Sequence, residues 1–202
     1  MVLPQFTPAE LARRSEPLDS GDYLFELKMD GFRALAYVGE HETRLVSRRG
    51  NVYKSFPNLT LLFTIDLDFE VVLDGEIVCL DAEGRPQFYE LLRRRGRGEP
   101  VFYVFDFLWL DGRDLRSTPL MERKRMLRDL VPEQPSVLLY AHHVESRGCD
   151  FFRFACERDL EGVVAKLKSG AYGERWYKIR NPKYSQYEGR RELFEKKHAV
   201  RT

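Results

Sequence analysis

Hydrophobic and polar residues alternate along much of this chain, at the spacing of two that is typical of half-buried strands. The clearest example is VFYVFDFLWL at 101–110, where Asp106 stands within a run of aromatic and other apolar residues. The same kind of pattern predicts strands at 23–27, 33–38, 43–47, 71–80, 101–110, 137–141, 162–167 and 175–180.

Helical spacing occurs in fewer places. The segment STPLMERKRMLRDLVPE at 117–133 has Thr118 as a candidate cap, and CDFFRFACERDLEG at 149–162 has Asp150 in that role. A third, weaker helix is expected at 57–67. Many strands with few crossover helices predict an α+β domain, built from antiparallel β-sheets flanked by helices.

Composition narrows the class of protein. The 202 residues are 43% hydrophobic, which is enough for a substantial core, and the charged residues nearly cancel to a net charge of +1. Any binding of nucleic acid must therefore depend on local patches of cations. Because the sequence has no apolar run of the ~20 residues that span a membrane, and no CxxC pair, we expect a cytoplasmic protein with reduced thiols and no membrane partner.

Six short segments place charged residues inside strands or at their ends. A charged residue in an apolar strand costs free energy unless it meets a counter-charge, a metal or a hydroxyl. An exposed strand end, or an edge strand protected by charge, explains each segment taken singly. The segments are KMDGFR (28–33), SRRG (47–50), LDGEIV (73–78), VFDFL (104–108), EGVVAK (161–166) and WYKIR (176–180).

Taken together, these segments contain the groups that bind a nucleoside triphosphate. Cations neutralise phosphates, carboxylates hold Mg²⁺ or ribose hydroxyls, and an aromatic ring covers a base. The chain has no Walker A, GxGxxG, HExxH or GxSxG motif. Lys28 is the candidate nucleophile, because a lysine becomes nucleophilic when it is desolvated or crowded by other cations. The candidate nucleotide-binding groups are Lys28, Arg33, Lys178, Arg180, Glu76, Glu161 and an aromatic residue of 101–110.

In their order and spacing, the six segments resemble the motif series of the covalent nucleotidyltransferases. The resemblance is strongest to the adenylation domain of bacterial ATP-dependent DNA ligases of the non-homologous end-joining type, and it runs from about residue 22 to 181. It implies the DNA ligase/mRNA-capping nucleotidyltransferase (ATP-grasp-like) fold. It also implies that Lys28 becomes linked to AMP from ATP, and that the AMP is then transferred to a 5′-phosphate of nicked or broken duplex DNA.

The resemblance assigns roles around the ribose and the base. Arg33 and Glu76 would contact the ribose, and Glu76 would also help to hold the metal. Arg48 would lie near the ribose and later near the 5′-phosphate of the DNA. Phe105 would stack on one side of the adenine, with Val163 on the other side.

Further roles are implied at the phosphates and at the edge of the base. Glu161 would hold Mg²⁺ (or Mn²⁺), and Lys178 and Arg180 would bind the phosphates. Glu26 and Leu27 would present backbone groups to the adenine edge. Arg180 stands where the family more often has lysine, which keeps the positive charge but adds a planar fork of donors.

The organisation of the chain departs from the family pattern. Family ligases continue into an OB-fold domain, and about 20 residues after Asn181 are too few for that five-stranded barrel. We therefore expect a lead-in at 1–21, an adenylation domain at 22–181 and a basic tail at 182–202, with the OB-fold domain absent. An OB-fold domain or end-joining repair proteins acting in trans are the expected partners, in a bacterial, nucleoid-associated setting.

Two alternatives remain open at this point. An RNA ligase or an mRNA-capping guanylyltransferase shares the lysine motif. A non-catalytic DNA-end-binding module could keep the fold without turnover. Intact Lys28, Glu76, Glu161 and Lys178 favour an active enzyme, and LDGEIV with EGVVAK favours the DNA ligase branch.

Overall fold

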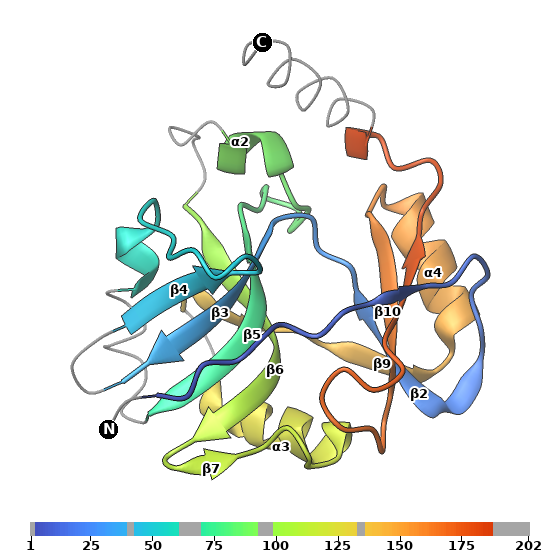
Figure 1. The fold of residues 1–202 in the computed structure, drawn as a ribbon. Coiled ribbons are helices and arrows are strands. Elements are labelled where there is room, and N and C mark those ends of the chain that lie inside the picture. The colour runs from blue at the N-terminus through green and yellow to red at the C-terminus, as the bar shows by residue number, and fades with distance from the viewer. Residues whose placement is uncertain (1–2, 40–42, 61–69, 93–98, 133–135, 188–202) are drawn as a thin grey trace, which may run out of the picture.

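Two curved β-sheets lie side by side in the fold (Figure 1). Side chains from both sheets line a hollow between them. The predicted α+β class, with mostly antiparallel sheets and few helices, is confirmed. The computed structural model describes residues 3–39, 43–60, 70–92, 99–132 and 136–187.

The first sheet carries the segment with Lys28. Within the described residues its strand order is β1-β11-β10-β2-β9, and neighbours are antiparallel except β1, which runs parallel to β11. Three of its strands correspond to predicted ones, whereas β1 and β9 were not predicted from the sequence. The strands are β1 (Ala12–Arg13), β2 (Ser20–Leu27), β9 (His143–Ser146), β10 (Gly162–Leu167) and β11 (Tyr177–Arg180).

The second sheet carries the segment with Glu76. In the part of the chain that the structure describes, its order is β4-β3-β5-β6-β7, and β8 pairs in parallel with β6. The register between β5 and β6 shifts twice, which marks bulges in this pair. The strands are β3 (Phe32–Val38), β4 (Thr43–Ser47), β5 (Val71–Val78), β6 (Val101–Leu110), β7 (Arg113–Asp114) and β8 (Leu138–Tyr140).

The helices pack mainly on the sheet faces that point away from the cleft. The helix α4 (Gly148–Glu157) contacts β2, β9 and β10, and α3 (Leu120–Leu130) contacts β6. A short helix, α2 (Phe88–Leu92), follows β5 and was not predicted. The expected helix at 57–67 is helical at 57–60, and 61–67 lie outside the described residues. None of the described helices combines the length and apolarity needed to cross a membrane.

The two predicted helix caps are wrong. The helix α3 is capped at Pro119 without a side-chain bond, and the Thr118 carbonyl instead accepts a hydrogen bond from the Arg123 guanidinium. The carboxylate of Asp150 lies inside the first turn of α4 and accepts hydrogen bonds from Arg147 and Arg153. Both oxygens are therefore engaged by arginines, which compete with the backbone N–H groups for them.

Each sheet buries its own outer face. The inner faces line the cleft, except where a third cluster with Leu35 and Val72 packs against Phe6 of the N-terminal segment. One hydrophobic cluster joins β3, β4, β5 and β6 to α3, and a separate cluster joins β2, β10 and β11 to α4. Alternate side chains of each strand point the other way, into the space between the sheets. The polar residues of the six segments are thereby brought to one place.

The N-terminal segment crosses the cleft before it joins the first sheet (Figure 1). The backbone N–H of Phe6 donates to the Tyr37 hydroxyl of the second sheet, and the carbonyl of Ala9 accepts a hydrogen bond from Arg33. Ala12 and Arg13 then pair with β11 of the first sheet. The segment expected to be a lead-in is therefore an integral part of the cleft wall.

Candidate active site

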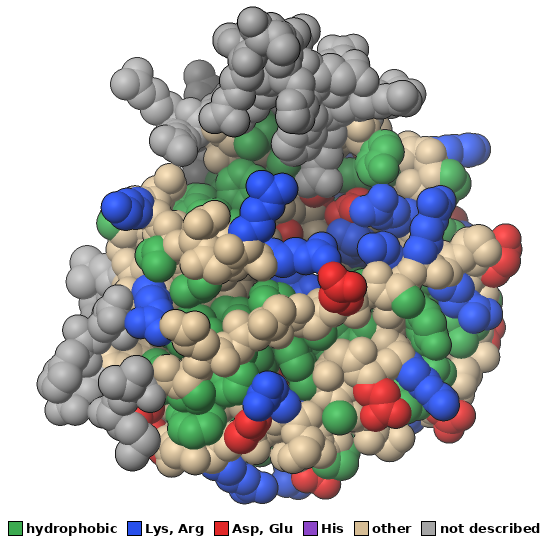
Figure 2. All heavy atoms as spheres, in the orientation of Figure 1, with side chains coloured by type: hydrophobic (Ala, Val, Ile, Leu, Met, Phe, Trp, Pro, Cys, Tyr) green, Lys and Arg blue, Asp and Glu red, His purple; other side chains and the backbone are tan. Residues whose placement is uncertain are grey.

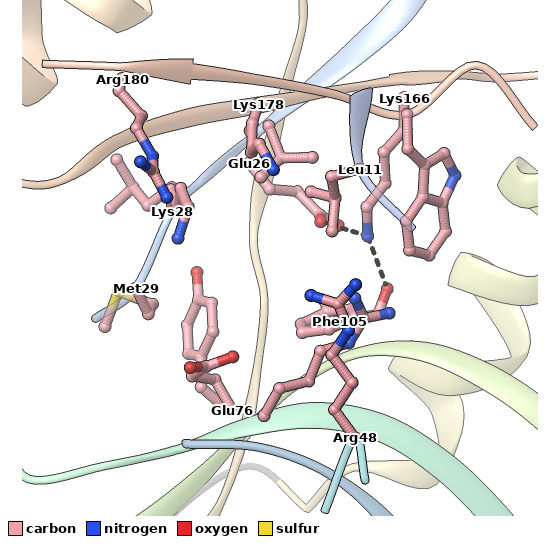
Figure 3. A pocket seen from close by; sticks show the side chains of 15 residues that line it. Leu11, Glu26, Lys28, Met29, Arg48, Glu76, Phe105, Lys166, Lys178 and Arg180 are labelled. Carbon is pink, nitrogen blue, oxygen red and sulfur yellow. Dashed lines mark hydrogen bonds and ion pairs between the residues drawn. The ribbon is translucent and has the colours of Figure 1, made fainter. Parts of the chain in front are cut away.

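Two adjoining hollows occupy the cleft. The inner hollow, of about 220 Å³, is lined among others by Phe105, Val164 and Trp176, and the outer one, of about 520 Å³, by Asp30 and Glu161. Figure 3 shows how the side chains of the inner hollow converge from the two sheets. The hollows form one continuous cleft, because both are lined by Lys28, Arg33, Arg48, Glu76 and Arg180.

Lys28 lies where β2 ends, at the junction of the two hollows. Its backbone N–H donates to the carbonyl of Gly162, at 2.9 Å, which ties the end of β2 to the start of β10. Its Nζ donates to Glu161 Oε2 at 2.6 Å, and its side chain is 21% exposed. The amine is therefore both fixed in position and accessible from the cleft.

Glu161 is the most unusual carboxylate of the site. Its side chain is only 2% exposed, and Oε1 has no hydrogen-bond partner within the part of the chain that the structure describes. Nε of Arg180 lies 3.7 Å from Oε1, beyond hydrogen-bond distance. A buried carboxylate oxygen without a partner is costly, so this atom is suited to a cation that arrives from outside.

Arg33, at the start of β3, is held by a dense set of contacts. Its guanidinium donates to both oxygens of Asp74, at 3.0 and 2.6 Å, and to the carbonyl of Ala9, at 2.7 Å. Burial alone would lower the pKa of Arg33, but the Asp74 carboxylate raises it overall. Tyr172 donates a further hydrogen bond to Asp74. The acidic residue inside β5 thus meets a cation and a hydroxyl, as its position in an apolar strand requires.

Glu76 faces the same space from the next inward position of β5. Burial, followed by the charges of Glu161 and Asp30, raises the pKa of Glu76 to about 8, although Lys28 and Arg33 act in the opposite direction. The carboxyl group is therefore largely protonated at neutral pH.

Cations crowd the mouth of the cleft (Figure 2). Burial lowers the pKa of Lys178, and the nearby charges of Arg180, Lys28 and Arg48 lower it further. Arg48 is 64% exposed and forms an ion pair with Glu10 at 2.7 Å. Such a concentration of positive charge favours a polyanion such as a chain of phosphates.

The inner hollow ends at a buried group of charges. Glu26 Oε1 accepts a hydrogen bond from Lys124, and Oε2 pairs with Lys166, both at 2.6 Å. Burial alone would raise the pKa of Glu26, but the two lysines hold it below its ordinary value. The Lys166 ammonium also lies over the rings of Phe105, at 4.4 Å, and Trp176, at 4.1 Å. Figure 3 shows Lys166 reaching between Glu26 and Phe105.

The structure brings the predicted site residues together with one exception. Val163 does not face the cleft. It is fully buried in the hydrophobic cluster of the first sheet with Phe25 and Ile179, and its neighbour Val164 lines the inner hollow instead. Gly162 has a φ of 139°, so the chain turns between Glu161 and the strand. Counting alternate residues from Glu161 therefore selects the wrong face of β10. The other predicted site residues all line the cleft: Glu26, Leu27, Lys28, Arg33, Arg48, Glu76, Phe105, Glu161, Lys178 and Arg180.

Several contributors were not predicted. Lys166 could have been found, because it lies in EGVVAK and faces the cleft two residues beyond Val164. Lys124 gives no such signal, since a lysine on an amphipathic helix is usually solvated. Leu11 of the N-terminal segment also lines the inner hollow, and a polar, proline-containing stretch gives no indication of that position.

Comparison with known families and proteins agrees with this geometry. The family model described as ATP dependent DNA ligase domain matches residues 7–180. The chain is 30% identical over 190 residues to the SPbeta prophage-derived DNA ligase-like protein LigB of Bacillus subtilis. The match covers 89% of this chain and 69% of that protein. It is 35% identical over 190 residues to the multifunctional non-homologous end joining protein LigD of Pseudomonas aeruginosa. That match covers 88% of this chain and 22% of that protein.

Solved structures give the same result. The mycobacterial DNA ligase D complexed with ATP and MES superposes with a TM-score of 0.76 at 30% identity, over 86% of this chain and 60% of that one. The ligase domain of LigD from M. tuberculosis superposes with a TM-score of 0.75 at 31% identity, over 86% of this chain and 59% of that one. The chain thus spans about three-fifths of each of these structures and about a fifth of the Pseudomonas relative.

Proposed function

The chain belongs to the family of ATP-dependent DNA ligase domains, and on that premise we propose that it charges Lys28 with AMP from ATP and passes the AMP to a 5′-phosphate of nicked or broken duplex DNA. The observation that carries this proposal is the position of Lys28. Its amine is accessible in a cleft crowded with cations and is hydrogen-bonded to a buried carboxylate, Glu161. A lysine that attacks a phosphate needs these surroundings.

The first step forms one bond and breaks one. Lys28 Nζ attacks the α-phosphorus, a P–N bond forms, and the bond from the α-phosphorus to the bridging oxygen breaks. Pyrophosphate leaves with that electron pair. The amine must lose a proton, and Glu161 Oε2, at 2.6 Å, is placed to receive it. Lys178 and Arg180 would stabilise the charge that develops on the phosphates.

The rest of ATP fits the cleft from its inner to its outer end. Phe105 and Val164, both in the lining of the inner hollow, would enclose the adenine, and Glu26 with Leu27 would meet its edge. Arg33 and Glu76 lie between the two hollows, where the ribose would be placed. Arg48, close to the mouth, would release Glu10 when a phosphate takes its place.

The site also fits a divalent metal, Mg²⁺ or Mn²⁺. Glu161 Oε1 is buried and lacks a hydrogen-bond partner among the described residues, and Glu76 faces the same space. Mg²⁺ is commonly bound by one or two carboxylates together with substrate phosphates, so Glu161 with Glu76 would supply the protein ligands. When bound, the metal would neutralise charge on the phosphates.

The wider setting follows from the relatives. Because the Pseudomonas relative is named for non-homologous end joining, we propose broken duplex DNA as the substrate and end-joining repair in the bacterial cytoplasm, at the nucleoid, as the role. Residues 22–181 would act as the adenylation unit, and an OB-fold domain or other end-joining proteins would assist in trans. The contacts with DNA phosphates would come from Arg48, the arginines at 93–97 and the tail at 190–201, of which the last two lie outside the described residues.

The deciding experiment measures the mass of the intact protein after incubation with ATP and Mg²⁺. We expect a gain of one AMP on Lys28, and no gain from GTP. No gain from ATP would overturn the proposed adenylation, and a gain from GTP would indicate a capping-type guanylyltransferase.

Transfer to DNA needs a second experiment, the sealing of a labelled nick at ~50 and ~200 mM salt. Phosphate contacts release counterions, so we expect sealing to be weak and to fall steeply with salt. An added OB-fold domain, or a pre-adenylated nick at low salt, should raise the yield. Efficient, salt-insensitive sealing by this chain alone would contradict the need for a partner.

A further inference from the structure

Three consecutive residues after β11 form hydrogen bonds with three separate segments of the chain. We call Tyr184, Ser185 and Gln186 the bridge segment. None of the six sequence segments includes them, and none of the three lines either hollow. Each nevertheless makes a side-chain or backbone hydrogen bond to an element that carries or adjoins a group of the active site.

Tyr184 reaches the loop that follows the nucleophile. Its hydroxyl donates to Asp30 Oδ2 at 3.0 Å, and both residues are buried, at 4% and 2% exposure. Asp30 lies two residues after Lys28, in the connection between β2 of the first sheet and β3 of the second. A buried carboxylate takes the orientation that its partners impose. Tyr184 therefore helps to fix the loop from which Lys28 projects.

Ser185 contacts the turn that precedes the other key group. Its backbone N–H donates to Asp159 Oδ1 at 2.9 Å, and its hydroxyl donates to Oδ2 of the same residue. Asp159 has a φ of 52° and stands two residues before Glu161. The loop that follows Lys28 and the turn that precedes Glu161 are thus bound by adjacent residues of one segment.

Gln186 extends the segment to the second sheet. Its Nε2 donates to the carbonyl of Pro86 at 2.9 Å, and its Oε1 accepts a hydrogen bond from the backbone N–H of Phe88 at 3.2 Å. Pro86 lies in the connection after β5, the strand that carries Glu76, and Phe88 begins α2. The amide therefore makes a two-point contact with the segment that follows β5 in the second sheet.

From these contacts we propose that the bridge segment positions Lys28 and Glu161 relative to the second sheet during self-adenylation. The inference rests on the proposed function, and it concerns positioning residues, because none of the three faces the nucleotide. Misplacement of a reacting group by about 1 Å can cost about a hundredfold in rate. The adenine hollow is built by other residues, so loss of the bridge should slow the chemical step and leave ATP binding nearly unchanged.

The test compares Tyr184→Phe, Gln186→Ala and the double variant with the full wild-type chain. Single-turnover self-adenylation is followed by intact mass over a range of ATP concentrations, which separates the maximal rate from the half-saturating ATP concentration. We expect the maximal rate to fall by about tenfold in each single variant and by more in the double variant, with half-saturation changed less than about twofold. Because Gln186 is half-buried at the surface, its truncation leaves the core intact.

The matched control is Tyr23→Phe, which removes a hydroxyl from the first sheet outside the cleft. It should charge at the wild-type rate. Unchanged maximal rates in Tyr184→Phe and Gln186→Ala would overturn the bridge proposal while leaving the proposed function intact. An equal loss of maximal rate and ATP affinity would also overturn it, as a merely structural effect. If the wild-type chain gains no AMP at all, the proposed function itself fails.

Discussion

The inner and outer ends of the cleft balance their charges in different ways. At the inner end, Glu26 is matched by Lys124 and Lys166, and each of its oxygens has a protein partner at 2.6 Å. At the outer end, Glu161 Oε1 has no hydrogen-bond partner among the described residues, and burial together with neighbouring cations lowers the pKa of Lys178. The charges of the inner end are matched by protein groups, whereas the outer end keeps a buried carboxylate oxygen suited to a cation.

This difference separates two uses of buried charge. A fully paired buried group is rigid and can present fixed donors and acceptors to a base, at a cost in desolvation. An incompletely paired group gains stabilisation only when a complementary ion arrives. Changes at the outer end should therefore affect chemistry more than folding, and changes at the inner end should affect folding first.

The largest expected effect is at the outer end. Lys28→Ala should abolish attachment of AMP while the fold is retained, because no other lysine among the described residues lines both hollows. Intact mass after incubation with ATP and Mg²⁺ measures the charging, and circular dichroism checks the fold. Lys168→Ala, a lysine paired with Glu145 outside the cleft, is the control and should charge normally. Charging of Lys28→Ala on a different lysine would show that the nucleophile is misassigned.

The next effect is at the inner end. Lys124→Met should destabilise the fold by about 3 kcal/mol, because it leaves Glu26 buried with one cation instead of two. Urea unfolding measures this change, and the double variant Lys124→Met/Glu26→Gln should recover part of the loss. A single variant as stable as the wild type would mean that the inner charges are not energetically coupled.

Replacing either of two residues proposed to act at the phosphates, Glu161 and Lys178, should lower the rate of self-adenylation and leave the stability nearly unchanged. Glu161→Ala and Lys178→Ala should each slow self-adenylation by about a hundredfold, the scale for removal of one preorganised charge partner. Their urea midpoints should stay close to the wild type, in contrast to Lys124→Met. Higher Mg²⁺ should partly restore Glu161→Asp. Full activity in either alanine variant would remove that residue from the site.

The smallest effect is the dependence of stability on pH. Because burial raises the pKa of Glu76 to about 8, the folded chain keeps a proton between about pH 5 and pH 8 that the unfolded chain has released. The unfolded state then binds fewer protons, so the free energy of unfolding falls as pH rises through this window. Melting temperatures across this range should fall less steeply for Glu76→Gln than for the wild type. Exposed Glu157→Gln is the control, and identical slopes for Glu76→Gln and wild type would contradict the shifted pKa.

Much of the fold could be predicted because alternation reports burial on one side of a strand. All the strands predicted from that pattern are present, since each has one face in a hydrophobic cluster and one facing elsewhere. The strands β1, β7 and β9 were missed because two or four residues are too few to show a period. The shifted register of β5 and β6 was also missed, and it places Phe107 in the core with Phe102 and not beside Phe105.

The site was predictable where a motif carries the chemistry and unpredictable where tertiary contacts supply it. Lys28, Glu76 and Lys178 follow from charged residues in apolar strands. The family resemblance placed Val163 at the base, whereas the turn at Gly162, which an alternating pattern does not show, brings Val164 to the cleft. The ion pair of Lys124 with Glu26 joins residues 98 positions apart, so the local sequence pattern does not indicate it.

The pairing of β1 with β11 has a consequence for synthesis on the ribosome. Ala12 and Tyr177 are partners although almost the whole chain lies between them, and β11 carries Lys178 and Arg180. Contacts between such distant positions form late, because the intervening chain must first be made and ordered. A nascent chain therefore exposes Lys28 early but lacks Lys178 and Arg180 of β11 until residue 180 has left the exit tunnel. Under the proposed function, the chain can charge Lys28 only after β11 has been made and paired.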